Sequence, residues 1–513
     1  MKKSLFALVF TVLITGSVFS NPISQNEKQS IKSFLSDGNY IECDEGNGGT
    51  VFIKNSKINT ITFKDGKITV HFLNGEENTF SYDSISIDDN KNLLVRKDAK
   101  SNATEKGKVL NIYTFNDELE GIIRNFFPGY NIASDRIGDV QVKWNIIPNS
   151  LDTYQMSLDH ILANQDTLSN DDKVDMFIVE PDYIQKYTYS PYTLDLKADL
   201  GITDEELSRQ FKYTQDIGSA GGKLKAVSWN CCPSGLIYRR SIAREVFGTD
   251  NPDIVQEMLS DWTKFNAAAE KVKSVGYSMV SGPNDNFLAF ADNKKTPWVV
   301  DGKINVDDSI REWIAQQKMF SDKDYSNKAH TWTEAQFMGM SGNEKVFCFF
   351  GPSWFIDFVM APQCEWNNRD VYGDWAFCMG PQGFNWGGTW ICAAAGSDNL
   401  NLVKEIILKI TTDDKTMEKI ARENFDFVNN MKTMSEIANS DYENKFLGGQ
   451  NHIKFLIDIA KSLDKSTLTI YDMDMNSMLM NAMDVYFRHA ATEDEAWDIF
   501  YESVKLKYPN LKK

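Results

Sequence analysis

The segment that decides the fold is KVFCFFGPSWFIDF, residues 345–358. Its apolar run, residues 346–350, has the length of a fully buried strand, and Gly351-Pro352 ends that strand. A helix is predicted to follow, with Ser353 in the position of an N-cap. In an open α/β sheet, ligands bind beyond the carboxyl ends of the strands, and the pattern places Trp354 at such an edge. The alternative is that Trp354 packs in the core, as most tryptophans do.

The first twenty residues have the features of a secretory signal peptide. Lys2 and Lys3 precede an apolar stretch at residues 5–14, and Val18 and Ser20 supply the small residues that predict cleavage before Asn21. The residue directly after this site is Asn21 and not Cys, so lipid attachment is not expected. No later segment reaches the roughly eighteen apolar residues of a membrane span, which predicts a soluble, exported protein.

The composition is acidic, with a formal net charge of −18 over 513 residues. Two of the lysines lie in the predicted signal peptide, so the mature chain is still more negative. Such a chain repels phosphate backbones, and no block of Lys and Arg compensates, so nucleic acid is not an expected partner. The length predicts two or more domains, because it is too great for a single core.

The sequence contains no pattern typical of a metal or cofactor site. The seven Cys, at positions 43, 231, 232, 348, 364, 378 and 392, form no C-x-x-C pair and have no His at metal spacing. We interpret them as small hydrophobic residues and leave open one or two disulfides. The acids that begin at Asp472 resemble the start of a calcium loop, but Ser477 and Met483 stand where the loop needs Gly and an acid. We therefore expect no metal and no cofactor.

Residues 37–97 have the alternation of a small antiparallel β module. Strand-like runs flank Asp65-Gly66 and Asn74-Gly75, the dipeptides most typical of two-residue hairpin turns. Residues 98–107 are small and polar, which predicts a linker.

From residue 109 onward, strand-like and helix-like segments alternate, which predicts an α/β fold with a parallel sheet covered by helices. Strands are expected at 109–115, 142–147, 174–179, 235–239, 346–350, 374–379 and 391–395. Helices are expected at 119–127, 154–162, 261–275, 310–319, 402–410, 413–424, 452–463 and 473–489. Polar clusters at 116–118 and 180–182 follow two of the strands, where they could face a ligand or cap the next helix.

Candidate catalytic groups are few. The five His are scattered, and none accompanies a nucleophile motif such as G-x-S-x-G. The strand-end carboxylates could pair for glycoside hydrolysis, but acids are plentiful in this chain. Tryptophans beside polar residues are more informative, because a sugar stacks its C–H face on an aromatic plane and directs its hydroxyls to short polar side chains. These tryptophans are Trp229, Trp354, Trp386 and Trp390.

The order and spacing of six segments resemble the extracellular solute-binding proteins of carbohydrate ABC importers, the family that includes the maltose-binding protein. The resemblance covers about residues 108–513. The segments are KVLNIYTFNDELEGIIRNFF (108–127), VDMFIVEPDYIQKY (174–187), GGKLKAVSWNCCPSGLIYRR (221–240), DWTKFNAAAEKVKSVGYSMV (261–280), MSGNEKVFCFFGPSWFIDFV (340–359) and WGGTWICAAAGSDNLNLVKEII (386–407).

This resemblance implies a two-lobed periplasmic-binding-protein fold, type II-like, in which a sugar or oligosaccharide binds between the lobes. The first lobe would comprise residues 108–228 and about 390–440. The second would comprise about 229–389 and 441–513, including the C-terminal helices. Hinge closure would present the ligand to an ABC permease; the protein would be a monomer and not an enzyme.

The resemblance also implies a set of ligand-binding residues. Trp354 would be the stacking platform, and either Trp386 or Trp390 would point inward near the second crossing. The full set is Asn116, Asp117, Glu118, Glu180, Asp182, Trp229, Asn230, Asn284, Asp285, Trp354, Trp386 and Trp390.

Two departures from the family pattern affect the interpretation. The missing lipobox favours a free periplasmic protein over an anchored one, with an extracellular location as the alternative. The β module lies outside the family pattern, so a glycan sensor or surface glycan-binding protein without transport remains the alternative function. A secreted glycosidase is a further one.

Overall fold

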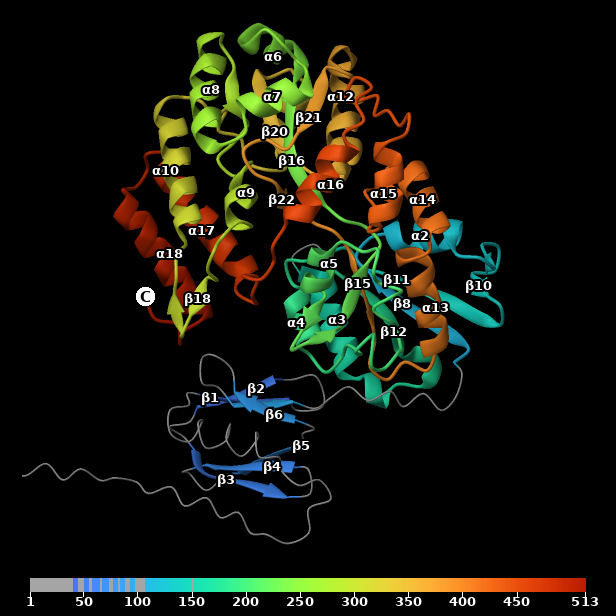
Figure 1. Ribbon diagram of the computed structural model, residues 1–513. Helices are drawn as coiled ribbons and strands as arrows, with labels where there is room; N and C mark the ends of the chain where they lie inside the picture. Colours follow the sequence, from blue (N-terminus) through green and yellow to red (C-terminus); the bar gives the residue numbers. More distant parts are fainter. Residues whose placement is uncertain are drawn as a thin grey trace, which may run out of the picture.

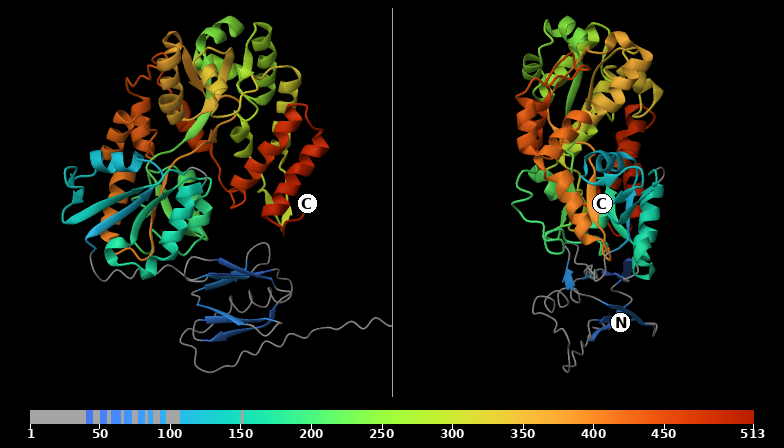
Figure 2. Two further views of the ribbon diagram at one scale, coloured as in Figure 1. Left: turned by 180° about the vertical axis from the view of Figure 1, so that it is seen from behind. Right: turned by 90° about the vertical axis from the view of Figure 1, so that its right-hand side faces the viewer.

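The computed structural model describes residues 107–149 and 152–513, together with strands between residues 40 and 96. Two α/β lobes lie next to each other and are joined by several crossing segments (Figure 1, Figure 2). The predicted signal peptide and nearly all of the predicted linker lie outside the described residues.

The first lobe is built on a seven-stranded sheet in the order β15-β23-β12-β8-β11-β10-β9. Its centre is parallel, as predicted, because β8 pairs in parallel with both β11 and β12. All six residues of β12 are buried, which fits its continuous apolar sequence. The strands are β8 (Val109–Thr114), β9 (Tyr130–Asn131), β10 (Arg136–Ile137), β11 (Val140–Ile146), β12 (Val174–Val179), β15 (Ala226–Ser228) and β23 (Trp390–Ala393).

The helices of the first lobe begin close to the predicted positions where the sequence has an amphipathic period. In α14, the side chain of Asp413 caps the helix by accepting a hydrogen bond from Thr416 N at 3.0 Å. The helices are α2 (Glu118–Phe126), α3 (Thr153–Ala163), α4 (Ile184–Thr188), α5 (Lys212–Ile217), α13 (Leu400–Thr411) and α14 (Asp414–Glu423).

The second lobe has a smaller sheet in the order β17-β20-β16-β21, with β22 paired to β16. Here the prediction of a parallel sheet is wrong: β16 is antiparallel to both β20 and β21, and only β17 and β20 are parallel. The reason is that β16 enters the lobe from the first lobe, opposite in direction to its neighbours. The strands are β16 (Pro233–Arg239), β17 (Ser278–Val280), β20 (Val346–Gly351), β21 (Trp375–Cys378) and β22 (Phe384–Asn385).

The segment after β20 is helical from Ser353, which is therefore not the N-cap that the sequence predicts. A π-helical turn at Phe355–Met360 leads into α12 (Ala361–Asn367). Such turns are rare and occur often at functional sites. The other helices of this lobe are α6 (Arg240–Phe247), α7 (Pro252–Met258), α8 (Trp262–Ser274), α9 (Phe287–Ala291), α10 (Asp308–Asp322), α11 (Glu334–Met340), α15 (Met431–Ala438) and α16 (Ile453–Ser462).

The chain passes between the two sheets at residues 229–232 and 386–389, and again near residues 424–430. These segments are hydrogen-bonded to one another: Asn230 forms a β-bridge with Val428, and Asn429 N donates to the carbonyl of Trp229 at 2.7 Å. The side chain of Asn429 is fully buried and bonds to Phe211 N, Thr214 Oγ1 and Ser228 O. Crossings that share hydrogen bonds form a defined hinge.

Two C-terminal helices, α17 (Asp472–Phe487) and α18 (Glu493–Lys507), pack beside α9 and α10 (Figure 1). The sequence predicts α17, whereas α18 is not predicted although Thr492 and Glu495 form a complete capping box at its start. A buried ion pair fixes α17 to this lobe, because Lys294 Nζ lies 2.8 Å from Asp472 Oδ1.

The strands before residue 97 form two small sheets, in the orders β2-β1-β7-β6 and β3-β4-β5. The predicted hairpins correspond to β3-β4 and β4-β5, both antiparallel. The module is not wholly antiparallel, because β1 pairs with β7 in parallel, a long-range pairing that no local turn signal reveals. The strands are β1 (Tyr40–Asp44), β2 (Thr50–Lys54), β3 (Ile58–Lys64), β4 (Lys67–Phe72), β5 (Glu77–Ser81), β6 (Ser84–Ile87) and β7 (Leu93–Arg96).

The six cysteines from Cys231 onward are buried and have free thiols. Among the described residues, no helix is both long and apolar enough to cross a membrane.

Candidate functional site

A cavity of about 370 Å³ lies where Asp182 of the first lobe faces the second lobe. Asp182 is three residues beyond β12, and Trp386 follows β22 at the start of a crossing. The remaining lining side chains come from strands, loops and helices of the second lobe and its C-terminal helices: Asn284, Asp285, Phe287, Leu288, Thr331, Trp332, Gln336, Phe349, Phe350, Phe355, Phe384, Met473, Asn476, Ser477 and Met480. The cavity is therefore contributed by both lobes.

One wall of the cavity is aromatic. The ring centroids of Trp332 and Trp386 are 5.8 Å apart, and those of Phe355 and Trp386 are 5.3 Å apart. Trp332 is 50% exposed and has a backbone φ of 64°, in the left-handed region that few non-glycine residues adopt. Its amide donates to Gln336 Oε1 at 2.8 Å, which holds the strained loop in place. Strain of this kind is concentrated at functional sites.

Trp354 is half-buried beside this wall and is not among the side chains that line the cavity. Its indole is nearly parallel to that of Trp332, at 20° and 6.4 Å, and meets Trp386 edge to face at 5.0 Å. The two tryptophans that line the cavity therefore pack on Trp354. The resemblance implies a stacking platform at Trp354, and the structure places this residue against Trp332 and Trp386, the two tryptophans of the lining.

A second polar group lies at the hinge. Glu118, half-buried at the start of α2, accepts a hydrogen bond from Asn230 Nδ2 at 3.4 Å, and Asn230 Oδ1 accepts one from Thr389 N at 3.1 Å. Asn116 Oδ1 accepts from Glu118 N at 3.3 Å. Through these hydrogen bonds, the side chain of Asn230 connects Glu118 of the first lobe to Thr389 of the second crossing. Its neighbour Asp117 is exposed and makes no capping hydrogen bond.

The carboxyl groups at the hinge have raised pKa values. Burial, partly offset by hydrogen bonds from Asn116 and Thr389, raises the pKa of Glu118 to about 7. The pKa of Glu180 is also raised to about 7, by burial first and then by the charge of Asp182. The pKa of Asp426 is raised well above its usual value, first by burial and then by the charge of Glu118. These acids are protonated near neutral pH more readily than ordinary carboxyls.

The predicted residues Asn284 and Asp285 both line the cavity, but the carboxylate of Asp285 is already hydrogen-bonded within the protein. Asp285 Oδ2 accepts from Ser281 N at 2.8 Å and Gly282 N at 2.9 Å, and Oδ1 accepts from Gln336 Nε2 at 3.1 Å. Asp285 thus shapes the loop at the end of β17, while the Asn284 side chain remains directed to the cavity.

Two predicted residues belong to the core instead of the site. Trp229 and Trp390 are both 0% exposed, and the Trp390 indole donates to the carbonyl of Thr214 at 2.9 Å. Trp390 begins the buried strand β23, and Trp229 directly follows the buried strand β15. Neither indole presents a face to a ligand.

Several residues that line the cavity are not predicted from the sequence. Met473, Asn476, Ser477 and Met480 are spaced at helical intervals along one face of α17, the face opposite to the buried Met475 and Leu479. The helical period was visible in the sequence, but nothing local indicates which face meets a cavity. Trp332 carried no signal beyond being a tryptophan in a polar loop.

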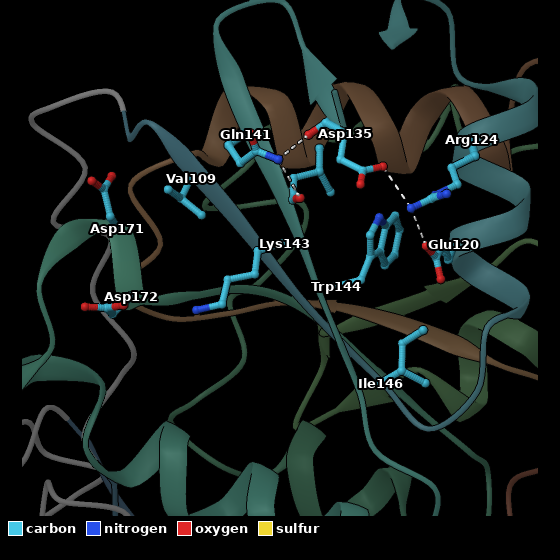
Figure 3. A pocket seen from close by; sticks show the side chains of 11 residues that line it. Val109, Glu120, Arg124, Asp135, Gln141, Lys143, Trp144, Ile146, Asp171 and Asp172 are labelled. Atoms are coloured by element: carbon cyan, nitrogen blue, oxygen red, sulfur yellow. Dashed lines mark hydrogen bonds and ion pairs between the residues drawn. The ribbon is translucent and has the colours of Figure 1, made fainter. Parts of the chain in front are cut away.

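A larger, more open pocket lies on the first lobe alone and is lined by residues between Val109 and Asp172 (Figure 3). Its arginine is neutralised, because Arg124 Nη2 lies 2.6 Å from Glu120 Oε1 and 2.8 Å from Asp135 Oδ1. The second lobe contributes no residue to the lining of this pocket. Among the described residues, no group of His, Cys, Asp or Glu side chains could hold a metal ion.

Two α/β lobes, hydrogen-bonded crossings and a cavity shared by both lobes define a two-lobed binding protein. The family model of bacterial extracellular solute-binding proteins matches residues 144–444, and the chain belongs to that family. No protein with a curated description matches the chain.

Solved structures show the same fold at low sequence identity. An extracellular solute-binding protein of family 1 is 16% identical with a TM-score of 0.66, over 78% of this chain and 99% of that chain. The sugar-binding protein MalE of Xanthomonas citri is 12% identical with a TM-score of 0.60, over 78% and 98%. The GacH receptor of Streptomyces glaucescens, solved unliganded and with acarbose, is 12% identical with a TM-score of 0.57, over 80% and 100%.

Proposed function

We propose that this protein captures a sugar or oligosaccharide between its lobes and delivers it to an ABC permease. The observation that carries the proposal is the shared cavity, in which Asp182 of one lobe faces Trp332 and Trp386 of the other. Aromatic planes stack on the C–H face of a sugar ring, and short polar side chains bond to its hydroxyls. Among the described residues that line the cavity none is Lys or Arg, which argues against a phosphorylated ligand.

The names of similar structures support the same ligand class. MalE of Xanthomonas citri is described as a sugar-binding protein, and the GacH receptor was solved with acarbose. In our proposal Asp182 and Asn284 bond to hydroxyl groups and Trp386 stacks on a ring. Glu118 and Glu180 both belong to the first lobe, close to the hinge, and would meet the ligand as the lobes close.

The mechanism that we propose is a shift between open and closed lobes. A ligand that contacts both lobes stabilises the closed form by the difference in its affinity for the two forms, and no bond is broken. The crossings near Asn230 and Asn429 provide the pivot, because their shared hydrogen bonds keep the segments together during rotation. The closed form would then be recognised by the permease.

Isothermal titration calorimetry against a panel of oligosaccharides tests the proposal. We expect saturable binding of at least one sugar, and a loss of at least tenfold in affinity for Trp386→Ala. Trp366→Ala is the matched control, because Trp366 is 76% exposed on α12 and is not among the lining residues. Absence of binding across the panel would contradict the proposal.

A glycan sensor or surface protein without transport is the second candidate, and the β module before residue 97 favours it because the module provides a separate docking unit. Deletion of residues 21–100 followed by an uptake assay separates the two. Unchanged uptake supports transport by the lobes alone. Loss of cell-surface retention with intact sugar binding supports the second candidate.

We further propose that the protein is a binder and not a glycosidase. Mass spectrometry of a bound oligosaccharide after prolonged incubation should recover it intact. We also propose an exported, periplasmic monomer: amino-terminal sequencing of the mature protein should begin at Asn21, and light scattering should give the mass of one chain.

A further inference from the structure

The cavity is more apolar than a site for a sugar alone requires. Five phenylalanines, each at most 2% exposed, form its floor, and the more exposed apolar surface comes from Leu288, Trp332, Trp386 and two methionines of α17. The apolar lining consists of Phe287, Leu288, Phe349, Phe350, Phe355, Phe384, Trp332, Trp386, Met473 and Met480. A sugar ring needs hydrogen-bond partners around its edge, which these side chains cannot supply.

Several of the polar side chains in the lining are already bonded within the protein. Asp285 uses both oxygens for Ser281 N, Gly282 N and Gln336 Nε2. Gln336 uses its Oε1 for Trp332 N at 2.8 Å, and Asn476 Oδ1 accepts from the indole of Trp298 at 2.9 Å. These groups fix the shape of the cavity and have little remaining capacity for a ligand.

The polar side chains without a hydrogen bond to the described part of the chain are Asp182, Asn284, Thr331 and Ser477. Asp182 reaches the cavity from the opposite lobe. The lining therefore contains both a polar set suited to hydroxyl groups and a larger apolar set. A ligand that is polar at one end and apolar at the other satisfies both.

We propose that the ligand is a glycoside that carries an aromatic aglycone, and that the aglycone occupies the apolar part of this cavity. Aromatic rings contact phenylalanine and tryptophan edges in the T-shaped geometry already present between Trp354 and Trp386, and methionine sulfur contacts aromatic ring edges. The flexible Met473 and Met480 lie on one face of α17 and adapt to the shape of the ring. This inference rests on the proposed sugar-binding function.

Calorimetry with paired glycosides tests the inference. Methyl, hexyl and phenyl β-glycosides of the common hexoses are compared with the full-length mature protein. We expect the phenyl glycoside to bind at least tenfold tighter than the methyl glycoside and at least threefold tighter than the hexyl glycoside. Equal affinity of phenyl and methyl glycosides overturns the inference while leaving sugar binding intact. A hexyl glycoside as tight as the phenyl one overturns the aromatic assignment.

Variants on α17 localise the effect. Met480→Gln should reduce the phenyl-over-methyl preference at least threefold, whereas Met478→Gln, on the same helix outside the lining, should keep it. Met473→Gln is a second variant, and its position tolerates a polar side chain because Met473 is 38% exposed. An unchanged preference in both cavity variants contradicts the inference. If no glycoside of any kind binds, the proposed function fails and this inference fails with it.

Discussion

The indole nitrogen of Trp354 donates a hydrogen bond to the backbone carbonyl of Trp386 over 3.1 Å. This bond connects the helix that follows β20 to the crossing that follows β22, and so fixes the aromatic wall to the hinge. One hydrogen bond of this kind contributes about 1 kcal/mol net.

Trp354→Phe should weaken sugar binding about fivefold, since it removes this hydrogen bond and keeps an aromatic ring behind Trp386. Trp354→Ala should weaken binding further, because Trp332 and Trp386 lose the surface on which they pack. Calorimetry measures both. Trp366→Phe, at an exposed tryptophan, controls for general effects. Wild-type affinity in Trp354→Phe would show that the bond has no role in holding the wall.

Asp472→Asn should lower the free energy of unfolding by about 3 kcal/mol, because it leaves the buried ammonium of Lys294 without its partner. Urea unfolding followed by tryptophan fluorescence measures the change. The comparison is Lys507→Met, which breaks the more exposed pair between Lys507 and Asp474 and should cost less than about 1 kcal/mol. Equal losses of unfolding free energy in the two variants would contradict the claim that the buried ion pair contributes more than the exposed one.

His452 should make the protein less stable as the pH falls from about 6.5 to about 4. Burial lowers the pKa of His452 to about 4, so the unfolded chain takes up a proton in this range and the folded chain does not. The contribution is about 3 kcal/mol. His452→Gln should reduce the slope of stability against pH in this window, measured by urea unfolding at several pH values. An identical slope in the variant would contradict a neutral buried imidazole.

Glu118→Gln should stabilise the protein more at pH 8 than at pH 5. The pKa of Glu118 is raised to about 7 when folded, so the folded state gains stability from its proton at low pH and loses it as the pH rises through 7. At pH 8 the gain in the variant is about 2 kcal/mol. Thermal unfolding at both pH values measures it, and the exposed neighbour Asp117→Asn is the control. A gain that does not depend on pH would refute the raised pKa.

The sequence allowed a good prediction of elements with strong local patterns. The buried run of β12 and the capped helix α8 agree with the expected positions, and Asp261 accepts from Lys264 N at 2.8 Å as its cap. Strand direction in the second sheet was not predictable, because β16 pairs with strands more than a hundred residues away and its direction depends on where the crossing enters.

For the site, the sequence identified side chains at strand ends but not their distances. Asp182, Asn284 and Trp386 do line one cavity, since strand ends from both lobes meet there. Trp229 and Trp390 also stand beside polar residues in the sequence and yet are buried, because Trp390 belongs to the buried strand β23 and Trp229 directly follows the buried strand β15. Burial of a tryptophan depends on long-range packing, which its immediate neighbours do not encode.

Gly107 marks the point where the described part of the first lobe begins. Its amide donates to the carbonyl of Asp398 at 3.2 Å, and an added side-chain carbon would lie 2.4 Å from Asn399 Nδ2. The chain is thus fastened at the amino end of β8, whereas Asn116 and Glu118 follow its carboxyl end. The described part of the first lobe is therefore entered at the end of β8 opposite to Glu118, whose carboxylate accepts the hydrogen bond from Asn230 at the crossing.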